Sequence, residues 1–161
     1  MALTVGDVER SIPDVIARHV ERRPDARAFA GTASPRTYAE LDVSANRHAH
    51  AVLDRRGAGP GRIALLLPDD ALLIEATLGV LKAGKTAVAL NASDPPARLE
   101  QLLDDARPEL VLADTDHAEL AASAGASRSD VLTIGEHGEA LPSGAPDVEV
   151  DPGRIAFVLY T

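Results

Sequence analysis

In Arg62–Leu90, RIALLLPDDALLIEATLGVLKAGKTAVAL, the chain shows its alternation of secondary structure most clearly. After Arg62, the run Ile63–Leu67 is continuously apolar, so Arg62–Leu67 predicts a buried strand ended by Pro68. Ala71–Ala83 is rich in Leu and Ala and contains no proline, so it predicts a helix that is buried on nearly every face. Thr86–Leu90 is a second short apolar run. We therefore expect a strand, a helix and another strand.

The same stretch contains a phosphate-loop pattern, because Gly79–Thr86 reads GVLKAGKT and matches G-x-x-x-x-G-K-T. A phosphate loop requires the order strand, loop, helix, since the turn amides and the helix N-terminus must point at the phosphates. Here the predicted order is reversed, and Gly84 stands where a helix C-terminal glycine belongs. We interpret the pattern as a helix terminus. A phosphate-loop nucleotidase is the alternative, which the structure around Gly84 decides.

The flanking segments repeat the alternation of helices and apolar strands. Helices are predicted to begin after Ser11 and after Thr37, where TYAE is a capping box, and to end near Arg22 and Arg56. Asp94 is expected to cap a further helix, with Pro95 as its first residue. The remaining predicted elements are strands over Arg27–Ala30, Pro35–Thr37, Glu109–Ala113, Val131–Ile134 and Arg154–Tyr160, and a helix from Asp114 or Thr115 to about Ala124. Such alternation is typical of an α/β fold, here an open, doubly wound, mostly parallel sheet with helices on both faces.

Composition narrows the classes of function. The chain has 161 residues, which is enough for one domain with its own core. Its net charge of −9 argues against nucleic acid or an anionic membrane surface as the main partner. It has no cysteine, which excludes disulfides and thiolate metal sites, and its histidine spacing predicts no metal site. Because we find neither a secretory signal nor an apolar run of about 20 residues, we expect a cytoplasmic protein.

Four segments, taken in order, resemble the adenylation domains of nonribosomal peptide synthetases, which belong to the AMP-forming acyl and aryl ligases. They are TYAEL from Thr37, RIALLLPD from Arg62, LKAG from Leu81 with PPARL from Pro95, and IAFVLYT from Ile155. The resemblance covers about residues 12–161. It departs from the family at four positions between LKAG and PPARL, which we interpret as changes in packing: Ala87, Ala89, Asn91 and Ala92.

This resemblance implies that residues 1–161 are the N-terminal portion of the large subdomain of an adenylate-forming enzyme. The parent enzyme would use ATP and Mg²⁺ to activate an amino acid or another carboxylic acid as acyl-AMP. It would then load the acyl group on the phosphopantetheine thiol of a carrier protein. IAFVLYT is similar to the strand before the family's glycine-rich phosphate loop, so Thr161 would lend its hydroxyl and N–H to the ATP phosphates. Tyr160 is expected to pack, not to bind. Asp69 and Asp70 lie near the pantetheine channel by resemblance, although their pattern also predicts a helix N-cap.

The chain stops one residue into that loop, so we expect this polypeptide alone to be inactive and to bind ATP weakly or not at all. Its expected partners are the remainder of the adenylation domain and, in the parent, the carrier protein. An uncovered apolar strand over Arg154–Tyr160 would also favour self-association. The alternative is a non-catalytic, truncated adenylation-like module with a docking or scaffolding role.

Overall fold

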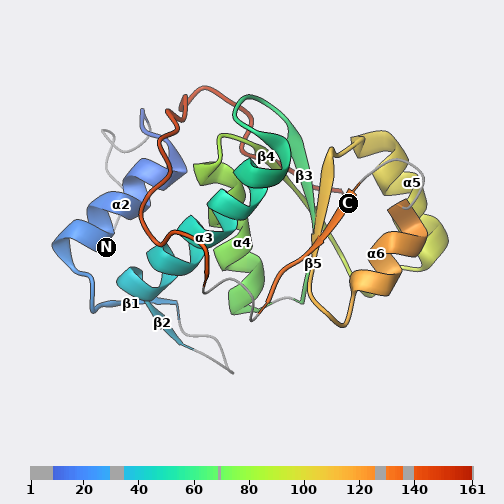
Figure 1. The fold of residues 1–161 in the computed structure, drawn as a ribbon, viewed down its shortest axis with the longest axis horizontal. Helices are drawn as coiled ribbons and strands as arrows, with labels where there is room; N and C mark the ends of the chain where they lie inside the picture. The colour runs from blue at the N-terminus through green and yellow to red at the C-terminus, as the bar shows by residue number, and fades with distance from the viewer. Residues whose placement is uncertain (1–8, 30–34, 69, 126–129, 136–139, 161) are drawn as a thin grey trace.

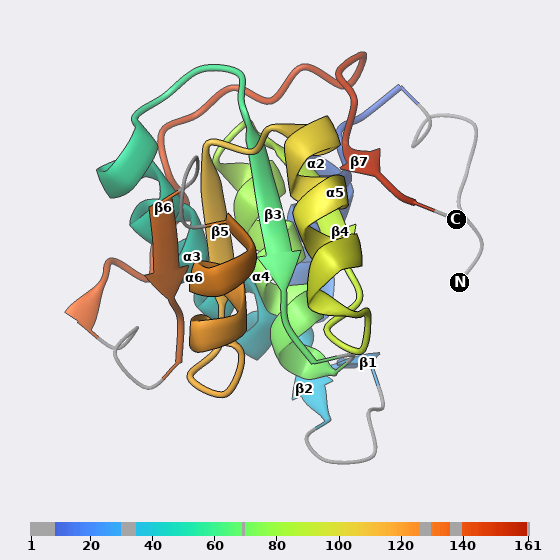
Figure 2. The same ribbon diagram turned by 90° about the vertical axis from the view of Figure 1, so that its right-hand side faces the viewer.

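The structure is a computed structural model that describes residues 9–29, 35–68, 70–125, 130–135 and 140–160. Its centre is one parallel sheet with the strand order β6-β5-β3-β4-β7 (Figure 2). The strands are β3 (Arg62–Leu66), β4 (Thr86–Leu90), β5 (Leu110–Ala113), β6 (Asp130–Thr133) and β7 (Phe157–Val158). All four neighbouring pairs are parallel. The predicted open parallel sheet is therefore confirmed.

Helices cover both faces of this sheet (Figure 1). α3 (Tyr38–Arg56) and α4 (Ala71–Lys82) lie on one face, and α5 (Pro96–Ala106) and α6 (Ala118–Gly125) lie on the other. The alternation of side chains along β3 supplies both interfaces, because Ile63 and Leu65 belong to one buried apolar cluster and Ala64 and Leu66 to the second. The doubly wound arrangement follows from strands that are apolar on both faces.

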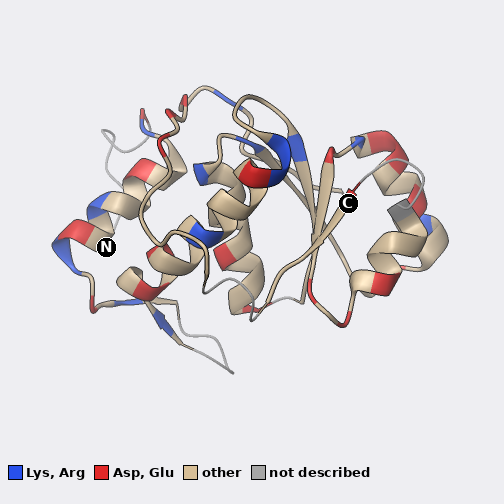
Figure 3. Ribbon diagram, viewed as in Figure 1, with Lys and Arg blue, Asp and Glu red and all other residues tan. Residues whose placement is uncertain are grey.

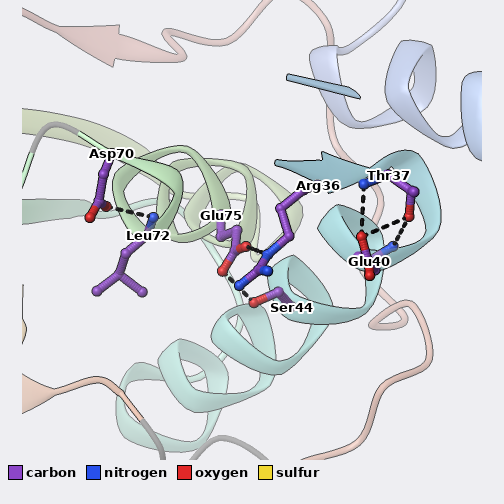
Figure 4. Close-up of polar contacts among 7 residues, drawn as sticks. All are labelled: Arg36, Thr37, Glu40, Ser44, Asp70, Leu72 and Glu75. Carbon is purple, nitrogen blue, oxygen red and sulfur yellow. Dashed lines mark hydrogen bonds and ion pairs between the residues drawn. The ribbon is translucent and has the colours of Figure 1, made fainter. Parts of the chain in front are cut away.

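Three further elements pack outside α3 and α4. α2 (Ile12–Arg22) contacts both helices, and β1 (Arg27–Phe29) pairs antiparallel with β2 (Arg36–Thr37). The predicted caps of α2 and α3 are present: before α2, the Ser11 hydroxyl accepts from the Asp14 N–H at 3.2 Å. In the capping box before α3, the Glu40 N–H donates to Thr37 Oγ1 at 3.2 Å and the Thr37 N–H donates to Glu40 Oε2 at 2.8 Å (Figure 4). Local capping chemistry thus fixes where these helices begin.

The starts of α5 and α6 differ from the prediction. Pro95, not Asp94, is the N-cap of α5, with φ −58° and ψ 145° and no side-chain cap bond, and the helix begins at Pro96. The reason is that a proline disfavours the helical region for the residue before it, so Pro96 holds Pro95 in an extended conformation. Asp114 accepts from the His117 N–H at 2.9 Å and caps a turn, while α6 itself begins three residues beyond Thr115, at Ala118.

β7 is much shorter than predicted. The apolar run Arg154–Tyr160 predicts a full strand inside the sheet, but only Phe157 and Val158 are in the ladder, at the edge beside β4. Ile155 and Leu159 are each 70% exposed. A strand with one neighbour forms half of the ladder bonds of a central strand, and its apolar side chains lack a second packing surface. Composition alone therefore overestimates the length of an edge strand.

Candidate functional site

The phosphate-loop pattern lies at the C-terminus of α4. The Gly84 N–H donates to Leu81 O at 3.0 Å and the Lys85 N–H donates to Val80 O at 3.1 Å. Gly84 has φ +71°, in the left-handed region that favours glycine. These two bonds and this conformation make a Schellman helix end. Because Thr86 then begins β4, the order is helix, turn, strand, and the phosphate-loop interpretation is wrong for this segment.

The residues that define the pattern have structural roles instead. A Cβ atom on Gly79 would lie 2.6 Å from His48 Cβ and 2.8 Å from Ala45 O, so this glycine lets α3 and α4 approach closely. The Lys85 ammonium lies 3.0 Å from Glu109 Oε1, and its side chain is 1% exposed. The chain has one other lysine, Lys82, whose buried ammonium pairs with the Asp42 carboxylate. Both lysines are therefore engaged at the end of the sheet opposite to the carboxyl ends of its strands.

The carboxyl ends of the strands are the edge where open α/β sheets bind ligands. β7 is parallel to β4, with Phe157 opposite Ala87 and Val158 opposite Val88. The chain therefore leaves β7 in the direction of that edge. Thr161, the one predicted ATP contact, lies outside the described residues.

Tyr160 packs, as predicted. Its ring lies against the apolar cluster on the α5 face, and its hydroxyl donates to Asp105 Oδ2 at 2.7 Å. Burial raises the pKa of the Tyr160 phenol, and the hydrogen bond to the Asp105 carboxylate raises it further. The phenol thus ties the chain beyond β7 to α5. The linear sequence gave no signal for this pair, because its two members are far apart in the chain.

Two features lie at the carboxyl ends of β3, β5 and β6. Asp70 is the N-cap of α4 and accepts from the Leu72 N–H at 2.8 Å, which confirms its predicted capping role; Asp69 lies outside the described residues (Figure 4). Beside Leu72, a cavity of about 580 Å³ opens between the segments that follow β5 and β6. Among the described residues, no group of three or more His, Cys, Asp or Glu side chains could hold a metal ion.

A buried carboxylate that the sequence did not predict joins β2, α3 and α4. Glu75 is 4% exposed, in a helix predicted from its apolar residues. Arg36 Nε donates to one of its oxygens at 2.8 Å and the Ser44 hydroxyl donates to the other at 2.7 Å (Figure 4). The hydrogen bond to Glu75 raises the pKa of the Arg36 guanidinium. With both oxygens occupied, this group serves the packing of α3 on α4.

The charged side chains are spread over the helices, and α5 carries mainly acidic ones (Figure 3). This distribution accords with the net charge of −9, and the exclusion of nucleic acid stays a prediction. Across the described part of the chain, every helix is too short or too polar to cross a membrane.

Comparison with known proteins gives the family. The sequence model of the AMP-binding enzymes matches residues 16–161. The chain belongs to the AMP-binding enzyme family. It is 35% identical over 150 residues to the probable non-canonical nonribosomal peptide synthetase CymA of Salinispora arenicola, which covers 92% of this chain and 2% of that protein. The chain spans between 1% and 28% of the length of eight of the curated relatives it matches.

Solved structures show the same fold. The nonribosomal peptide synthetase FmoA3 in its alpha-methyl-L-serine-AMP bound form aligns with a TM-score of 0.83 and 22% identity, over 94% of this chain and 17% of that one. A benzoate CoA ligase from Burkholderia xenovorans LB400 aligns with a TM-score of 0.77 and 25% identity, over 92% of this chain and 32% of that one. The resemblance to adenylate-forming enzymes read from the sequence is therefore confirmed, together with its fold.

Proposed function

We propose that residues 1–161 are the N-terminal portion of the large subdomain of an ATP-dependent adenylating ligase. The family match over residues 16–161 carries this proposal. In the parent reaction, a carboxylate oxygen of the substrate attacks the α-phosphorus of ATP. A bond from that oxygen to phosphorus forms and the bond to pyrophosphate breaks, which gives acyl-AMP. The thiol of a carrier protein's phosphopantetheine then attacks the acyl carbon and releases AMP.

The contribution of this part of the chain would be positional. ATP, with Mg²⁺, supplies the phosphate that is attacked, and Thr161 would lend its hydroxyl and N–H to the phosphates. Positioning of reacting groups is a major source of rate in such reactions. β7 leads to Thr161 along β4, and the hydrogen bond from Tyr160 to Asp105 holds the chain just before it. The similarity to CymA favours a carrier protein over coenzyme A as the acceptor. Because the cytoplasm supplies ATP, the proposal includes a cytoplasmic location.

We expect these 161 residues alone to bind Mg-ATP weakly and to be inactive. Adenylation requires donors around the transferring phosphate, and lysine is a common phosphate ligand. Lys82 and Lys85 are both buried and paired with carboxylates at the far end of the sheet. The fold would therefore supply a scaffold here, while later segments of the adenylation domain supply the remaining ligands of ATP.

The remainder of the adenylation domain is the proposed partner of an apolar groove beside β7. The groove has a volume of about 370 Å³, and its lining comes from α2, α3, α4, β4 and β7, including Ile12, Ile74 and Phe157. These three side chains are between 39% and 44% exposed. A cluster of exposed apolar side chains of this kind usually marks an interaction surface. In a complete domain we expect it to be covered.

ATP–pyrophosphate exchange with a mixture of amino acids tests the proposal. A chain that continues past Thr161 through the family's later motifs should exchange, and residues 1–161 alone should not. Mixing residues 1–161 with those later segments as a second polypeptide should restore part of the exchange. If the extended chain shows no ATP–pyrophosphate exchange with any substrate tested, the result would instead support the non-catalytic docking module.

A further inference from the structure

The residues that mimic a phosphate loop contact the segment that leads into β7. The Thr86 hydroxyl donates to Ile155 O at 2.8 Å, and the Ala87 N–H donates to Ala156 O at 2.9 Å. Arg154 Nη1 donates to Gly84 O at 3.4 Å. A Cβ atom on Gly84 would lie 3.1 Å from Val148 Cγ1, so the glycine leaves room for that side chain. Four contacts therefore join residues 84–87 to residues 148–156.

A second group of contacts holds the same segment further from the sheet. Lys82 Nζ donates to Asn46 Oδ1 at 2.6 Å, which orients the Asn46 amide. The amide nitrogen of Asn46 donates to Ser143 O at 2.7 Å and also to Asp42 Oδ2 at 3.1 Å. His50 Nε2 lies 3.0 Å from Gly144 O. α3 and the end of α4 thus hold the chain at Ser143 and Gly144, which precede β7 by 14 and 13 residues.

β7 needs such contacts because its own ladder is short. It pairs with β4 over two residues only, Phe157 and Val158. A shift of the β7–β4 pairing by one residue would move every β7 side chain to the opposite face of the sheet. A ladder of two residues resists such a shift weakly. In the present register Val158 and Tyr160 pack on the α5 face. A contact from a β4 side chain to a backbone carbonyl of the incoming chain distinguishes the correct register from the slipped one.

We propose that residues 82–87 form a dock that fixes the register of β7, with Thr86 and Gly84 as positioning residues. The Thr86 hydroxyl selects the Ile155 carbonyl, and Gly84 admits Val148 beside the helix end. The dock would also orient the chain after Tyr160 toward the phosphates of ATP, and this consequence rests on the proposed function. The dock itself does not rest on it, because all of its contacts are within this chain.

Amide hydrogen exchange, measured by NMR on residues 1–161 without nucleotide, tests the dock. Thr86→Val removes the hydroxyl at nearly constant shape. Exchange of the Ala87 N–H, which is bonded to Ala156 O, should then rise about fivefold, as expected for the loss of one hydrogen bond. Thr86→Ser keeps the hydroxyl and should restore protection. The Glu109 N–H, bonded to Arg62 O between β3 and β5, should be unchanged. Thr133→Val, on β6, is the matched control.

Alanine variants of two glycines distinguish loss of the dock from the effect of backbone strain on hydrogen exchange. Gly84 and Gly57 have φ +71° and +65°, but nothing lies within 4 Å of a Cβ built on Gly57. Gly84→Ala and Gly57→Ala both place an alanine at a positive φ, so both strain the backbone. Only Gly84→Ala should raise hydrogen exchange of the Ala87 N–H more than that of the Glu109 N–H. Equal exchange at Ala87 in the wild type, Thr86→Val and Thr86→Ser would overturn the dock, as would a rise that is uniform across the sheet. Because no nucleotide is present, failure of the proposed adenylation would leave this result unaffected.

Discussion

β4 and β7 are neighbouring parallel strands with similar apolar sequences, but they differ in length and burial. β4 lies between β3 and β7, spans five residues, and buries Ala87 and Val88 completely. In the part of the chain that the structure describes, β7 has β4 as its one neighbour and spans two residues, and Ile155 and Leu159 beside it are 70% exposed. The difference shows that an apolar run predicts the presence of a strand, while the number of neighbours determines how far the strand extends. Stability should therefore be concentrated around β3 and β4.

Truncating one leucine in each region gives the largest expected contrast. Leu65 in β3 is completely buried, and Leu65→Ala should lower the free energy of unfolding by about 2–5 kcal/mol through lost burial and a cavity. Leu159→Ala, beyond β7, should change it by less than about 0.5 kcal/mol. Urea denaturation followed by circular dichroism measures both values. Similar losses in the two variants would show that the β7 edge is as well packed as the centre.

The close approach of α3 and α4 beside β3 gives the next contrast. Gly79→Ala places a Cβ atom 2.6 Å from His48 Cβ and 2.8 Å from Ala45 O, so the two helices must separate. Overpacking costs about 1–3 kcal/mol, and the better helix propensity of alanine offsets about 1 kcal/mol of this. We expect a net loss of up to about 2 kcal/mol by urea denaturation. Gly144→Ala, where nothing lies within 4 Å, is the control and should be close to neutral.

The exposed edge should also associate. Ile155, Phe157 and Leu159 present apolar surface beside a strand edge that is unpaired among the described residues, and such edges pair with other chains. We expect a dimer or a higher oligomer at micromolar concentration by light scattering. Leu159→Lys should shift the protein toward monomer. A clean monomer in the wild type, unaffected by the later segments of the domain, would favour a self-sufficient module.

The smallest expected effect is the pH dependence of the free energy of unfolding that arises from His48, at the contact between α3 and α4. Burial lowers the pKa of His48, and the nearby Glu75 carboxylate opposes this shift in part. Below about pH 6.5 the unfolded state binds a proton at this histidine more readily than the folded state does. Stability should therefore fall as the pH decreases through that range. His48→Gln should show a shallower fall between pH 7 and pH 5 in urea denaturation at each pH. Parallel curves for the two proteins would contradict this account.

The parts of the fold that sequence predicts well are those governed by local chemistry. The capping box at Thr37, the helix end at Gly84 and the buried strand β3 each depend on residues a few positions apart, and each is present. α5 begins one residue later than predicted, because Pro96 disfavours the helical conformation for Pro95. The extent of β7 could not be predicted in this way, because it depends on which strands lie beside it.

In the candidate site too, features set by neighbouring residues were predictable and contacts between distant residues were not. The role of the GVLKAGKT pattern was predictable from the order of elements around it, and the capping role of Asp70 from its position before a helix. The contacts of Glu75 with Arg36, and of Thr86 with Ile155, join residues that are distant in the chain. No spacing rule reveals such pairs. They emerge once the helices and the sheet are assembled.

Titration calorimetry with Mg-ATP on residues 1–161 tests the central claim, that GVLKAGKT is a helix end and a structural contact, not a phosphate loop. The claim predicts no saturable binding at micromolar nucleotide, because Lys85 is buried against Glu109 and the amides of Gly84 and Lys85 donate to helix carbonyls. Lys85→Ala should lower stability without changing the titration. Micromolar binding of Mg-ATP that disappears in Lys85→Ala would contradict the claim.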